Sequence, residues 1–300
     1  MINKTNVLKE NFKDNIFYNE TLSKYSWFNL GGPAEIFFKP KSIEQLSSFL
    51  KNISNDLKKI NVIGAGSNTL IRDNGIKGVT IKLSPTFASV NLIDKDLIKV
   101  GAATLDRQLS NFATDNSLSG LEFLSCIPGS IGGGIIMNSG CYEHDISQIL
   151  VSVEVMDQNG LIKKIKATDI KFTYRGSDLP KDLIILSAIF KAQRADIDSI
   201  KKKQNELVDR KKKDQPSRVK TCGSTFKNPI NKKAWKLIKD SNCHNYSVGQ
   251  AKISKKHCNF FINEGKATSS DIENLIKKVQ ETVLKKTGIN LELEIKIIGK

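Results

Sequence analysis

Residues 120–142 read GLEFLSCIPGSIGGGIIMNSGCY, and this stretch decides how the rest of the chain is interpreted. Its glycines gather at Gly129 and at Gly132–Gly134 among small and apolar residues, with almost no charge. A glycine cluster costs backbone entropy, so it usually marks positive φ or a close approach of the main chain to another group. The N–H groups of such a loop can converge on an anion. Two interpretations follow from this stretch alone: a loop that clasps a dinucleotide, or a glycine-rich surface turn.

A second loop of small residues, Gly64-Ala65-Gly66-Ser67-Asn68, favours the nucleotide interpretation. The apolar segment Ile60–Ile63 leads into this loop, and Val79–Leu83 follows as another buried strand. A loop at the end of a strand is a common place for a bound phosphate in α/β proteins. The spacing is not G-x-G-x-x-G, however, and no helix begins directly after the loop. The pattern therefore does not indicate a Rossmann fold.

Composition indicates a globular protein. The length of 300 residues suggests two or three compact units, and 39% hydrophobic with 26% charged residues is ordinary for such a protein. No apolar run approaches the ~20 residues that span a bilayer, and the start of the chain lacks the apolar core of a signal peptide. We therefore expect a cytoplasmic protein.

The formal net charge of +16 raises the possibility of a nucleic-acid partner. The basic residues are scattered, however, and the densest runs, at 201–203 and 210–213, lack interleaved aromatic residues. A lysine-rich solvated surface is the preferred interpretation. The five cysteines show neither a C-x-x-C pair nor a histidine spacing for zinc, so we expect reduced thiols and no metal.

Hydrophobic periodicity places helices and strands along the chain. Ser42 and Gln45 have capping-box spacing ahead of an apolar helical face formed by Leu46, Phe49, Leu50, Ile53 and Leu57. Thr104 is expected to cap the next helix, whose inner face is Leu105, Leu109 and Phe112. The pattern also predicts strands at 34–38, 183–190, 260–263 and 291–298, hairpins at 90–100 and 150–165, and helices at 196–214, around Trp235, and from Ile272 to a stop at Gly288.

Eight short motifs occur in one order along nearly the whole chain, from Tyr25 to Gly299. They are Gly31-Gly32-Pro33-Ala34, 64–68, 127–133, Met137-Asn138-Ser139-Gly140, Tyr174-Arg175-Gly176-Ser177, Gly223-Ser224 with Phe226-Lys227-Asn228-Pro229, 254–263 and 294–299. Each motif is weak alone. In this order, the chain resembles the UDP-N-acetylenolpyruvoylglucosamine reductase family, FAD enzymes that complete UDP-N-acetylmuramate for peptidoglycan.

Two departures from the family pattern are visible. Cys126 stands where the family usually has glycine, and Gly134 stands where it usually has alanine. Both keep a small residue, so we expect flavin binding to survive. The compact length without extra inserted segments resembles the shorter, type II form of the family.

The resemblance implies an α+β fold in three parts. Residues 1–85 and 86–195 would be the two subdomains of an FAD-binding part with the vanillyl-alcohol-oxidase-like (PCMH-type) fold, and residues 196–300 a C-terminal α+β substrate-binding domain. The implied activity is NADPH-dependent, FAD-mediated reduction of UDP-N-acetylglucosamine enolpyruvate to UDP-N-acetylmuramate, with FAD bound non-covalently. The implied partner is this small-molecule UDP-sugar enolpyruvyl ether, and we expect a monomer that binds neither nucleic acid nor membrane.

This reaction needs a hydride at the far carbon of an enol ether and a proton at the carbon beside the carboxylate. Negative charge builds on the carboxylate as hydride arrives, so cationic or hydrogen-bonding groups and an acid must face it. A guanidinium fork matches a carboxylate, which suits Arg175. By resemblance, Ser224 is the proton donor, Arg175 and Glu294 stabilise the enolate, and Tyr174, Lys227 and Asn228 lie at the substrate. The implied cofactor-binding residues are Gly64, Ala65, Gly66, Ser67, Asn68, Pro128, Gly129, Ser130, Gly132 and Gly133.

Each catalytic candidate also has a structural interpretation. Ser224 fits a turn or cap, Arg175 a surface ion pair, and Glu294 the solvent face of an alternating strand. His257 is interpreted as a structural histidine, whereas His144 leaves open a covalent link to the flavin. The competing functions are another flavoprotein oxidase of this fold acting on a sugar or alcohol, and a non-enzymatic basic nucleotide- or nucleic-acid-binding protein supported by charge alone.

Overall fold

The computed structural model describes residues 12–53 and 59–300. The chain forms two compact units that alternate along the sequence. Unit 1 comprises Met1–Tyr18, Ile36–Ala65 and Gly78–Arg210, and unit 2 comprises Asn19–Glu35, Gly66–Lys77 and Lys211–Lys300. The division at residues 85 and 195 stays a prediction.

A four-stranded sheet has the order β1-β2-β5-β3, with β1 at Ile16–Thr21, β2 at Pro33–Phe38, β3 at Ile60–Val62 and β5 at Ile76–Ile81. Within unit 1, helix α2 (Ile43–Asn52) begins where the sequence predicts, because the Ser42 hydroxyl accepts the N–H of Gln45 at 3.1 Å. The rings of Phe38 and Phe49 stack with centroids 3.9 Å apart and join the helix to the sheet. Leu57, expected on the same helical face, lies outside the described residues.

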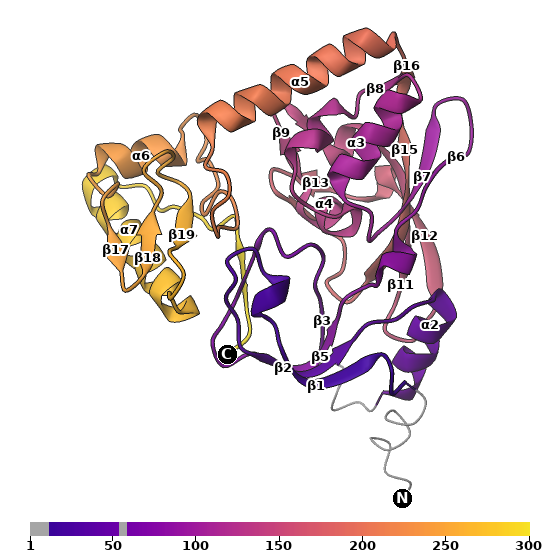
Figure 1. Ribbon diagram of the computed structural model, residues 1–300, viewed down its shortest axis with the longest axis horizontal. Helices are drawn as coiled ribbons and strands as arrows, with labels where there is room; N and C mark the ends of the chain where they lie inside the picture. Colours follow the sequence, from indigo (N-terminus) through magenta and orange to yellow (C-terminus); the bar gives the residue numbers. More distant parts are fainter. Residues whose placement is uncertain (1–11, 54–58) are drawn as a thin grey trace, which may run out of the picture. The chain divides into compact units, whose positions relative to one another are not determined.

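The larger sheet of unit 1 is antiparallel with the order β12-β11-β15-β7-β6. Its strands are β6 (Val90–Leu92), β7 (Leu97–Gly101), β11 (Leu150–Met156), β12 (Ile162–Lys166) and β15 (Ile184–Lys191). Helices α3 (Asp106–Asp115) and α4 (Ile131–Met137) lie against one face of this sheet and enclose an apolar core with it (Figure 1). Both predicted hairpins are confirmed, and Gly160 takes the positive φ of 74° that the second turn requires.

The start of α3 differs from the prediction. Its N-cap residue is Leu105, which is 46% exposed, and Thr104 instead bonds through its hydroxyl to both backbone groups of Ser89. The side chain that is fully buried there is Asp106. Of the predicted inner face, Leu109 is fully buried and Phe112 packs against the core, so only Leu105 was wrong. Apolar periodicity cannot indicate an aspartate that is buried in a core.

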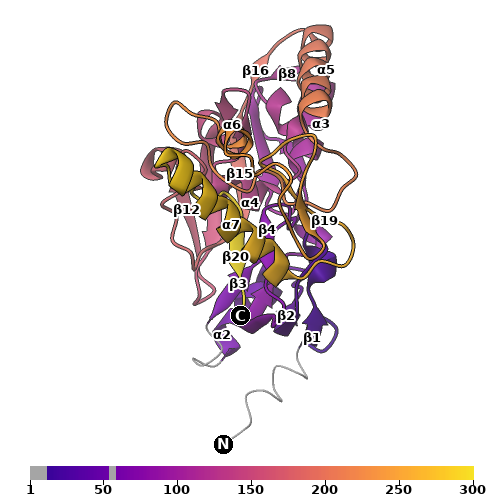
Figure 2. The same cartoon turned by 90° about the vertical axis from the view of Figure 1, so that its left-hand side faces the viewer.

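Unit 2 is built on a three-stranded antiparallel sheet of β17 (Ser247–Val248), β18 (Ala251–Ile253) and β19 (Phe261–Asn263). The long helix α7 (Ser269–Thr287) packs on this sheet beside α6 (Ala234–Asp240), and Figure 2 shows its full length. A capping box between Thr268 and Asp271 begins α7, and Gly288 ends it at a φ of 70°. The predicted inner face is buried at each of Ile272, Leu275, Ile276, Val279 and Val283.

Three strands of unit 2, β4 (Thr69–Ile71), β17 and β18, were not predicted. Strand β4 directly follows the loop at 64–68 and pairs in parallel with β20 (Lys296–Ile298). The strand expected over 291–298 is regular only in that last part. The short apolar sequence of β4 gives no periodic signal, and its partner is more than two hundred residues away in the sequence.

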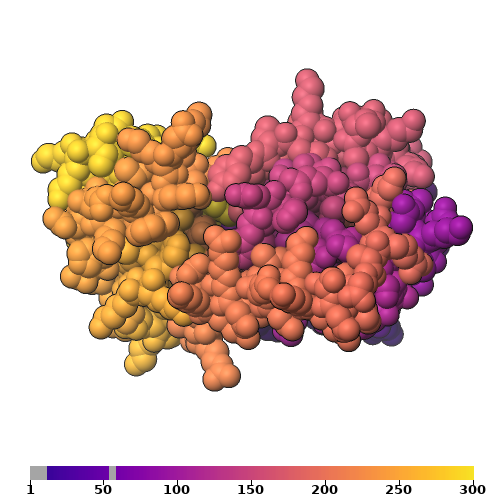
Figure 3. All heavy atoms as spheres, turned by 90° about the horizontal axis from the view of Figure 1, so that it is seen from above, coloured from indigo at the N-terminus to yellow at the C-terminus, as the bar shows by residue number. Residues whose placement is uncertain are grey.

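The shorter elements are two-residue pairs and 3-10 turns. The pairs are β8 (Leu118–Ser119) with β16 (Gln193–Arg194), β9 (Gly140–Cys141) with β10 (His144–Asp145), and β13 (Phe172–Thr173) with β14 (Gly176–Ser177). The turns are η1 (Ser23–Tyr25), η3 (Pro85–Phe87), η4 (Glu122–Cys126), η5 (Ile146–Gln148) and η6 (Ala167–Asp169). Helix α5 (Ile197–Asp214) has one buried residue, Ile200, and carries Lys211, Lys212 and Lys213 in its last turn. Its atoms belong to the orange-red band on the face that Figure 3 shows. All five cysteines are thiols rather than disulfides.

Candidate functional site

Two predicted cofactor segments meet in unit 1: Gly64-Ala65, the first part of the loop at 64–68, and the loop at 127–134, here called the organising loop. A Cβ added to Gly64 would lie 2.6 Å from Ser130 Oγ and 3.8 Å from the Cα of Gly133. The side chain of Lys82 donates a hydrogen bond to the carbonyl of Gly64 from the strand side. Burial, with Lys39 as a second cause, lowers the pKa of Lys82. Two of the predicted cofactor segments are therefore in direct contact, and a cation borders them.

Backbone hydrogen bonds fix the organising loop to the chain before α3. The N–H of Ile131 donates to Thr104 O at 2.9 Å, and that of Gly132 to Ala102 O at 3.0 Å. Gly134 N–H then closes the first turn of α4 on Ser130 O at 2.8 Å. Pro128 lies exposed ahead of this turn. The loop is thus held rigidly before any ligand binds.

The loop leaves room for a flat or anionic group at one place. Beyond its own helix, a Cβ on Gly133 would have Ser130 Oγ as its single neighbour within 4 Å among the described residues, at the ordinary distance of 3.5 Å. A larger side chain there would occupy space that the protein itself does not use. A backbone without side chains beside open space suits the diphosphate of FAD, so these residues fit the cofactor.

Asp106 lies on the inner side of the same loop, and sequence reasoning missed it. A Cβ on Gly129 would be 2.4 Å from Asp106 Oδ2, and one on Gly134 would be 3.3 Å from Asp106 Oδ1. The Asp106 N–H donates to Gly129 O at 3.2 Å. Among the described residues, neither carboxylate oxygen has a hydrogen-bond partner. Burial raises the pKa of Asp106 to about 8.

The second part of the loop, Gly66 to Asn68, belongs to unit 2. Gly66 has a φ of 73°, and a Cβ there would lie 1.8 Å from Tyr25 O, so this position accepts only glycine. Ser67 is half-buried beside it. The Asn68 side chain donates to Glu294 O at 3.1 Å, and Asn68 O accepts from Lys296 N–H at 2.9 Å. Within unit 2, this part of the loop is tied to the segment that carries Glu294.

Arg175 occupies the tight turn between β13 and β14 in unit 1, with a φ of 61°. Its Nη2 donates to Gly140 O at 2.8 Å, and its guanidinium carbon lies 5.0 Å from the centre of the Tyr174 ring. Asn138 reinforces the contact, because its amide donates to Thr173 O at 3.1 Å. The Tyr-Arg-Gly-Ser and Met-Asn-Ser-Gly motifs therefore pack together.

Ser224 lies in a rigid turn of unit 2. Gly223 precedes it with a φ of 79°, which favours glycine, and Ser224 forms an isolated antiparallel bridge with Phe260. Asn259 holds Phe226, two residues after Ser224, at both of its backbone groups: it accepts from Phe226 N–H at 3.0 Å and donates to Phe226 O at 2.8 Å. Asn259 lies in the motif at 254–263, but nothing in the sequence indicated that its side chain supports this turn.

Glu294 lies next to the serine turn. Its N–H donates to Thr225 O at 2.9 Å, and the neighbouring pair Phe226 and Leu293 forms an antiparallel bridge. The structure therefore brings two of the predicted catalytic residues, Ser224 and Glu294, onto adjoining backbone segments of unit 2. Glu294 is half-buried rather than solvent-facing.

The two predicted substrate residues that follow Ser224 have different surroundings. Lys227 is 27% exposed and lies 3.8 Å from the carboxylate of Glu292, which is itself largely exposed. Asn228 Oδ1 accepts the N–H of Ala234 at 3.0 Å and so helps to begin α6. Asn228 therefore has a structural role at this helix start, whatever else it contacts.

Three further polar residues, two histidines and a cysteine, have surroundings that indicate structural roles. His257 packs edge-on against Phe260, with ring centroids 4.8 Å apart, and burial lowers its pKa. His144 stacks on Phe123 at 5.8 Å. Cys222, two residues before Ser224, donates to Thr69 O at 3.4 Å, and burial raises the pKa of its thiol to about 11. A thiol with that pKa is not a nucleophile near neutral pH.

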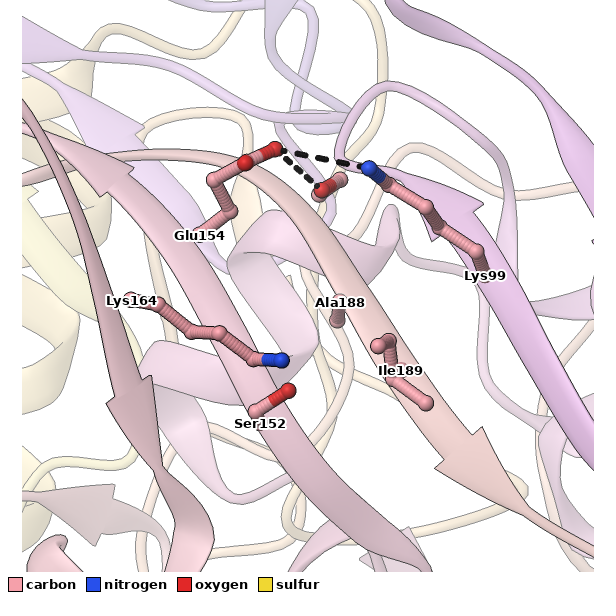
Figure 4. A pocket seen from close by; sticks show the side chains of 7 residues that line it. Lys99, Ser152, Glu154, Lys164, Ala188 and Ile189 are labelled. Atoms are coloured by element: carbon pink, nitrogen blue, oxygen red, sulfur yellow. Dashed lines mark hydrogen bonds and ion pairs between the residues drawn. The ribbon is translucent and has the colours of Figure 1, made fainter. Parts of the chain in front are cut away.

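Two hollows are lined by none of the predicted catalytic, cofactor-binding or substrate-binding residues. A cavity of about 70 Å³ opens on the polar face of the larger sheet in unit 1, where Lys99 and Glu154 form an ion pair at 3.7 Å, and Ser187 donates to Glu154 at 2.9 Å (Figure 4). It contains none of the predicted site residues. A larger one of about 380 Å³ in unit 2 is lined by residues that include Lys252 and Ser254.

No helix within residues 12–53 and 59–300 has both the length and the apolar character needed to cross a membrane. The same residues contain no group of three His, Cys, Asp or Glu side chains placed to hold a metal ion.

Family models match both parts of the chain. One described as "FAD binding domain" matches residues 34–166, and one described as "UDP-N-acetylenolpyruvoylglucosamine reductase, C-terminal domain" matches residues 215–298. The expected order of an FAD-binding part and a C-terminal domain is therefore confirmed.

Relatives with the name UDP-N-acetylenolpyruvoylglucosamine reductase match almost the whole chain. The protein from Pelagibacter ubique (strain HTCC1062) is 47% identical, covering 94% of each chain, and that from Rickettsia typhi is 44% identical, covering 98% of each. The crystal structure of the reductase from Thermus caldophilus superimposes with a TM-score of 0.82 at 31% identity, over 95% of this chain and 98% of that one. These matches confirm the α+β fold.

Proposed function

Because the chain belongs to the UDP-N-acetylenolpyruvoylglucosamine reductase family, we propose that it reduces UDP-N-acetylglucosamine enolpyruvate to UDP-N-acetylmuramate for peptidoglycan synthesis. The electron donor is NADPH, and FAD is the cofactor between donor and substrate. The observation that carries this proposal is the 47% identity to a named reductase over 94% of both chains. The contact between Gly64 and Ser130 supports it, because it brings the two predicted cofactor segments together next to Gly133, where the protein leaves space for a diphosphate.

The cofactor would be held without a covalent bond by Gly64, Ala65, Gly66, Ser67, Asn68, Pro128, Gly129, Ser130, Gly132 and Gly133. The N–H groups of Ile131 and Gly132 are already donated to Thr104 O and Ala102 O, so the diphosphate would lie against the remaining backbone of this loop at Gly133, with the Ser130 hydroxyl beside Gly64. When bound, FAD supplies two-electron chemistry, accepting hydride from NADPH and passing it to the double bond.

Arg175 binds the carboxylate of the enolpyruvyl group. Its guanidinium provides paired donors for the two oxygens and stabilises the charge that develops there when hydride arrives. The bond from Arg175 Nη2 to Gly140 O orients the fork before substrate binds. Tyr174, whose ring lies against the guanidinium, forms part of the same substrate contact.

Ser224 gives the proton to the carbon beside the carboxylate. A serine hydroxyl is a weak acid, so its role depends on a strongly basic enolate and on neighbours that stabilise the alkoxide. The rigid turn fixed by Asn259 holds the Ser224 backbone in one position. Glu294, which the bond from its N–H to Thr225 O holds on the adjoining segment, would stabilise the enolate as the protonated acid, because only that form can donate a hydrogen bond. Lys227 and Asn228 contact the sugar nucleotide.

The protein would act as a cytoplasmic monomer on a small-molecule substrate. The substrate's anionic groups and the lysine-rich surface suit one another, and the scattered charge needs no nucleic acid as a partner.

The experiment that tests this function follows NADPH oxidation by absorbance with and without the enolpyruvyl sugar nucleotide. Oxidation that depends on the sugar nucleotide, with UDP-N-acetylmuramate as the product, is expected. Equal NADPH oxidation with and without it would contradict the proposal.

A further inference from the structure

Asp106 is a buried acid placed directly behind the loop that receives the diphosphate. Its carboxyl group fills the space that side chains at Gly129 and Gly134 would need, and it is fully buried. Loss of all hydrogen bonds from a buried carboxylate is costly, yet among the described residues this one has no partner at either oxygen. An apolar side chain of similar size would fill the same volume without that cost, so the acid needs an explanation.

The charge of Asp106 opposes the ligand of this loop. An ionised Asp106, whose Oδ2 lies 2.4 Å from the position of a Cβ on Gly129, would repel an anion bound to the loop, because its buried surroundings screen charge poorly. An uncharged carboxylic acid has no such effect. The protonation state of Asp106 is therefore coupled to the occupancy of the loop.

The surroundings favour the uncharged form. The titratable groups on the elements around Asp106 are Arg107 and Asp115 on α3, Glu122 and Cys126 on η4, and His144 and Asp145 in β10, before η5. None of them contributes to the pKa shift of Asp106, which has burial as its cause. The segment 129–134 carries no titratable side chain.

We propose that Asp106 is a positioning residue of the FAD site: as an uncharged acid it supports the glycine loop around the diphosphate, and its ionisation weakens FAD binding. This inference rests on the proposed function insofar as FAD is the ligand of the loop.

The coupling has a definite sign. The pKa of Asp106 is about 8 without ligand, and a bound diphosphate must raise it further because it disfavours the carboxylate. Between these two pKa values, binding takes up one proton, so the dissociation constant rises by up to about tenfold per pH unit. Affinity is thus highest below pH 8 and falls above it.

The test is the dissociation constant of FAD, measured at pH 7, 8 and 9 by diluting the holoprotein and recording the fluorescence of released flavin. We expect the constant to rise about tenfold between pH 7 and pH 9 in the wild type. Asp106→Asn keeps the shape without the charge, so its constant should stay within about threefold of the wild type at pH 7 and change little up to pH 9. Asp115→Asn, an exposed change on the same helix, should keep the wild-type rise.

A flat wild-type profile would overturn the proposal without any variant, and so would an Asp106→Asn profile that keeps the rise. If Asp106→Asn does not fold, Asp106→Ser serves as the second uncharged variant. The outcome is separable from that of the proposed function: pH-dependent FAD binding without substrate-dependent NADPH oxidation contradicts the function alone, and turnover with pH-independent FAD binding contradicts this inference alone.

Discussion

The hydroxyl oxygen of Ser130 lies 2.6 Å from the position that a Cβ on Gly64 would occupy. Two segments that are far apart in the sequence thus meet at one point of unit 1. Gly64 has no room for a side chain there, and Gly133 adds an open position beside the contact, which suits a diphosphate. This contact is the structural basis for the cofactor assignment.

Gly133→Val should give folded but colourless protein. The glycine has open space beyond its helix, so the protein tolerates a branched side chain there, whereas a diphosphate in that space does not. Flavin content is measured by the absorbance of the purified protein. Met137→Val places the same side chain at the other end of α4 and should remain yellow. Wild-type flavin content in Gly133→Val would contradict the assignment, and flavin that stays with acid-precipitated wild-type protein would instead reveal a covalent link.

Arg175→Lys should reduce turnover by ~10²-fold or more, the scale of losing one preorganised electrostatic contact. Lysine keeps the charge but cannot present two parallel donors to a carboxylate. Steady-state NADPH oxidation gives the rate, and flavin content should not change. Arg194→Lys is the matched control, because Arg194 also donates to a backbone carbonyl, that of Asn116, in unit 1. Wild-type turnover in Arg175→Lys would show that the assignment is wrong.

Asn259→Ala should lower the free energy of unfolding by about 2–4 kcal/mol, since it leaves two buried backbone groups of Phe226 without partners. Denaturant unfolding measures this change. Asn52→Ala removes one exposed hydrogen bond to Ser48 O and should cost well under 1 kcal/mol. Similar losses in the two variants would mean that Asn259 does not support the turn that carries Ser224.

His257→Gln should make the protein less sensitive to mild acid. Burial lowers the pKa of His257 in the folded protein, while the unfolded chain takes up the proton near pH 6.5. The unfolded state therefore binds more protons below pH 6.5, and this group destabilises the fold as the pH falls from 7 to 5. Unfolding curves at both pH values should show a smaller difference for His257→Gln than for the wild type. His244→Gln, at an exposed position, should behave as the wild type does. A larger acid sensitivity in His257→Gln would contradict the structural interpretation.

Elements with a strong local signal could be predicted from the sequence. Helix α7 has a full apolar face and a glycine that ends it, so its bounds follow from periodicity and positive φ. The β11–β12 hairpin follows from Asn159-Gly160 in the same way. In both cases the information lies within about twenty residues of chain.

Features that depend on distant residues could not be predicted. Strand β4 exists because β20 pairs with it, and Asp106 is buried because the glycine loop folds over it. The two hydrogen bonds between Asn259 and the backbone of Phe226 also join residues that are distant in the sequence. The motifs could place Ser224, Arg175 and Glu294 in the sequence, but their surroundings required the fold.

Ser224→Ala should slow one half-reaction and leave the other intact. Reduction of the flavin by NADPH delivers no proton to carbon, so it should keep its wild-type rate. Reoxidation by the enolpyruvyl substrate should fall by ~10²–10⁴-fold, the usual contribution of a positioned acid. Ser224→Cys, with a more acidic proton in nearly the same place, should retain more of this step, and Ser247→Ala at an exposed position of β17 should change neither. If Ser224→Ala slows both steps alike, or neither, then Ser224 is a turn residue.

The most direct test of the reductase assignment is the reoxidation of the wild-type protein without oxygen. The flavin is first reduced under anaerobic conditions and then mixed with UDP-N-acetylglucosamine enolpyruvate while its absorbance is recorded. We predict full recovery of the oxidised flavin spectrum, with one UDP-N-acetylmuramate formed for each flavin. A flavin that stays reduced with this substrate and reoxidises only when oxygen is admitted would contradict the account and would identify an oxidase of the same fold.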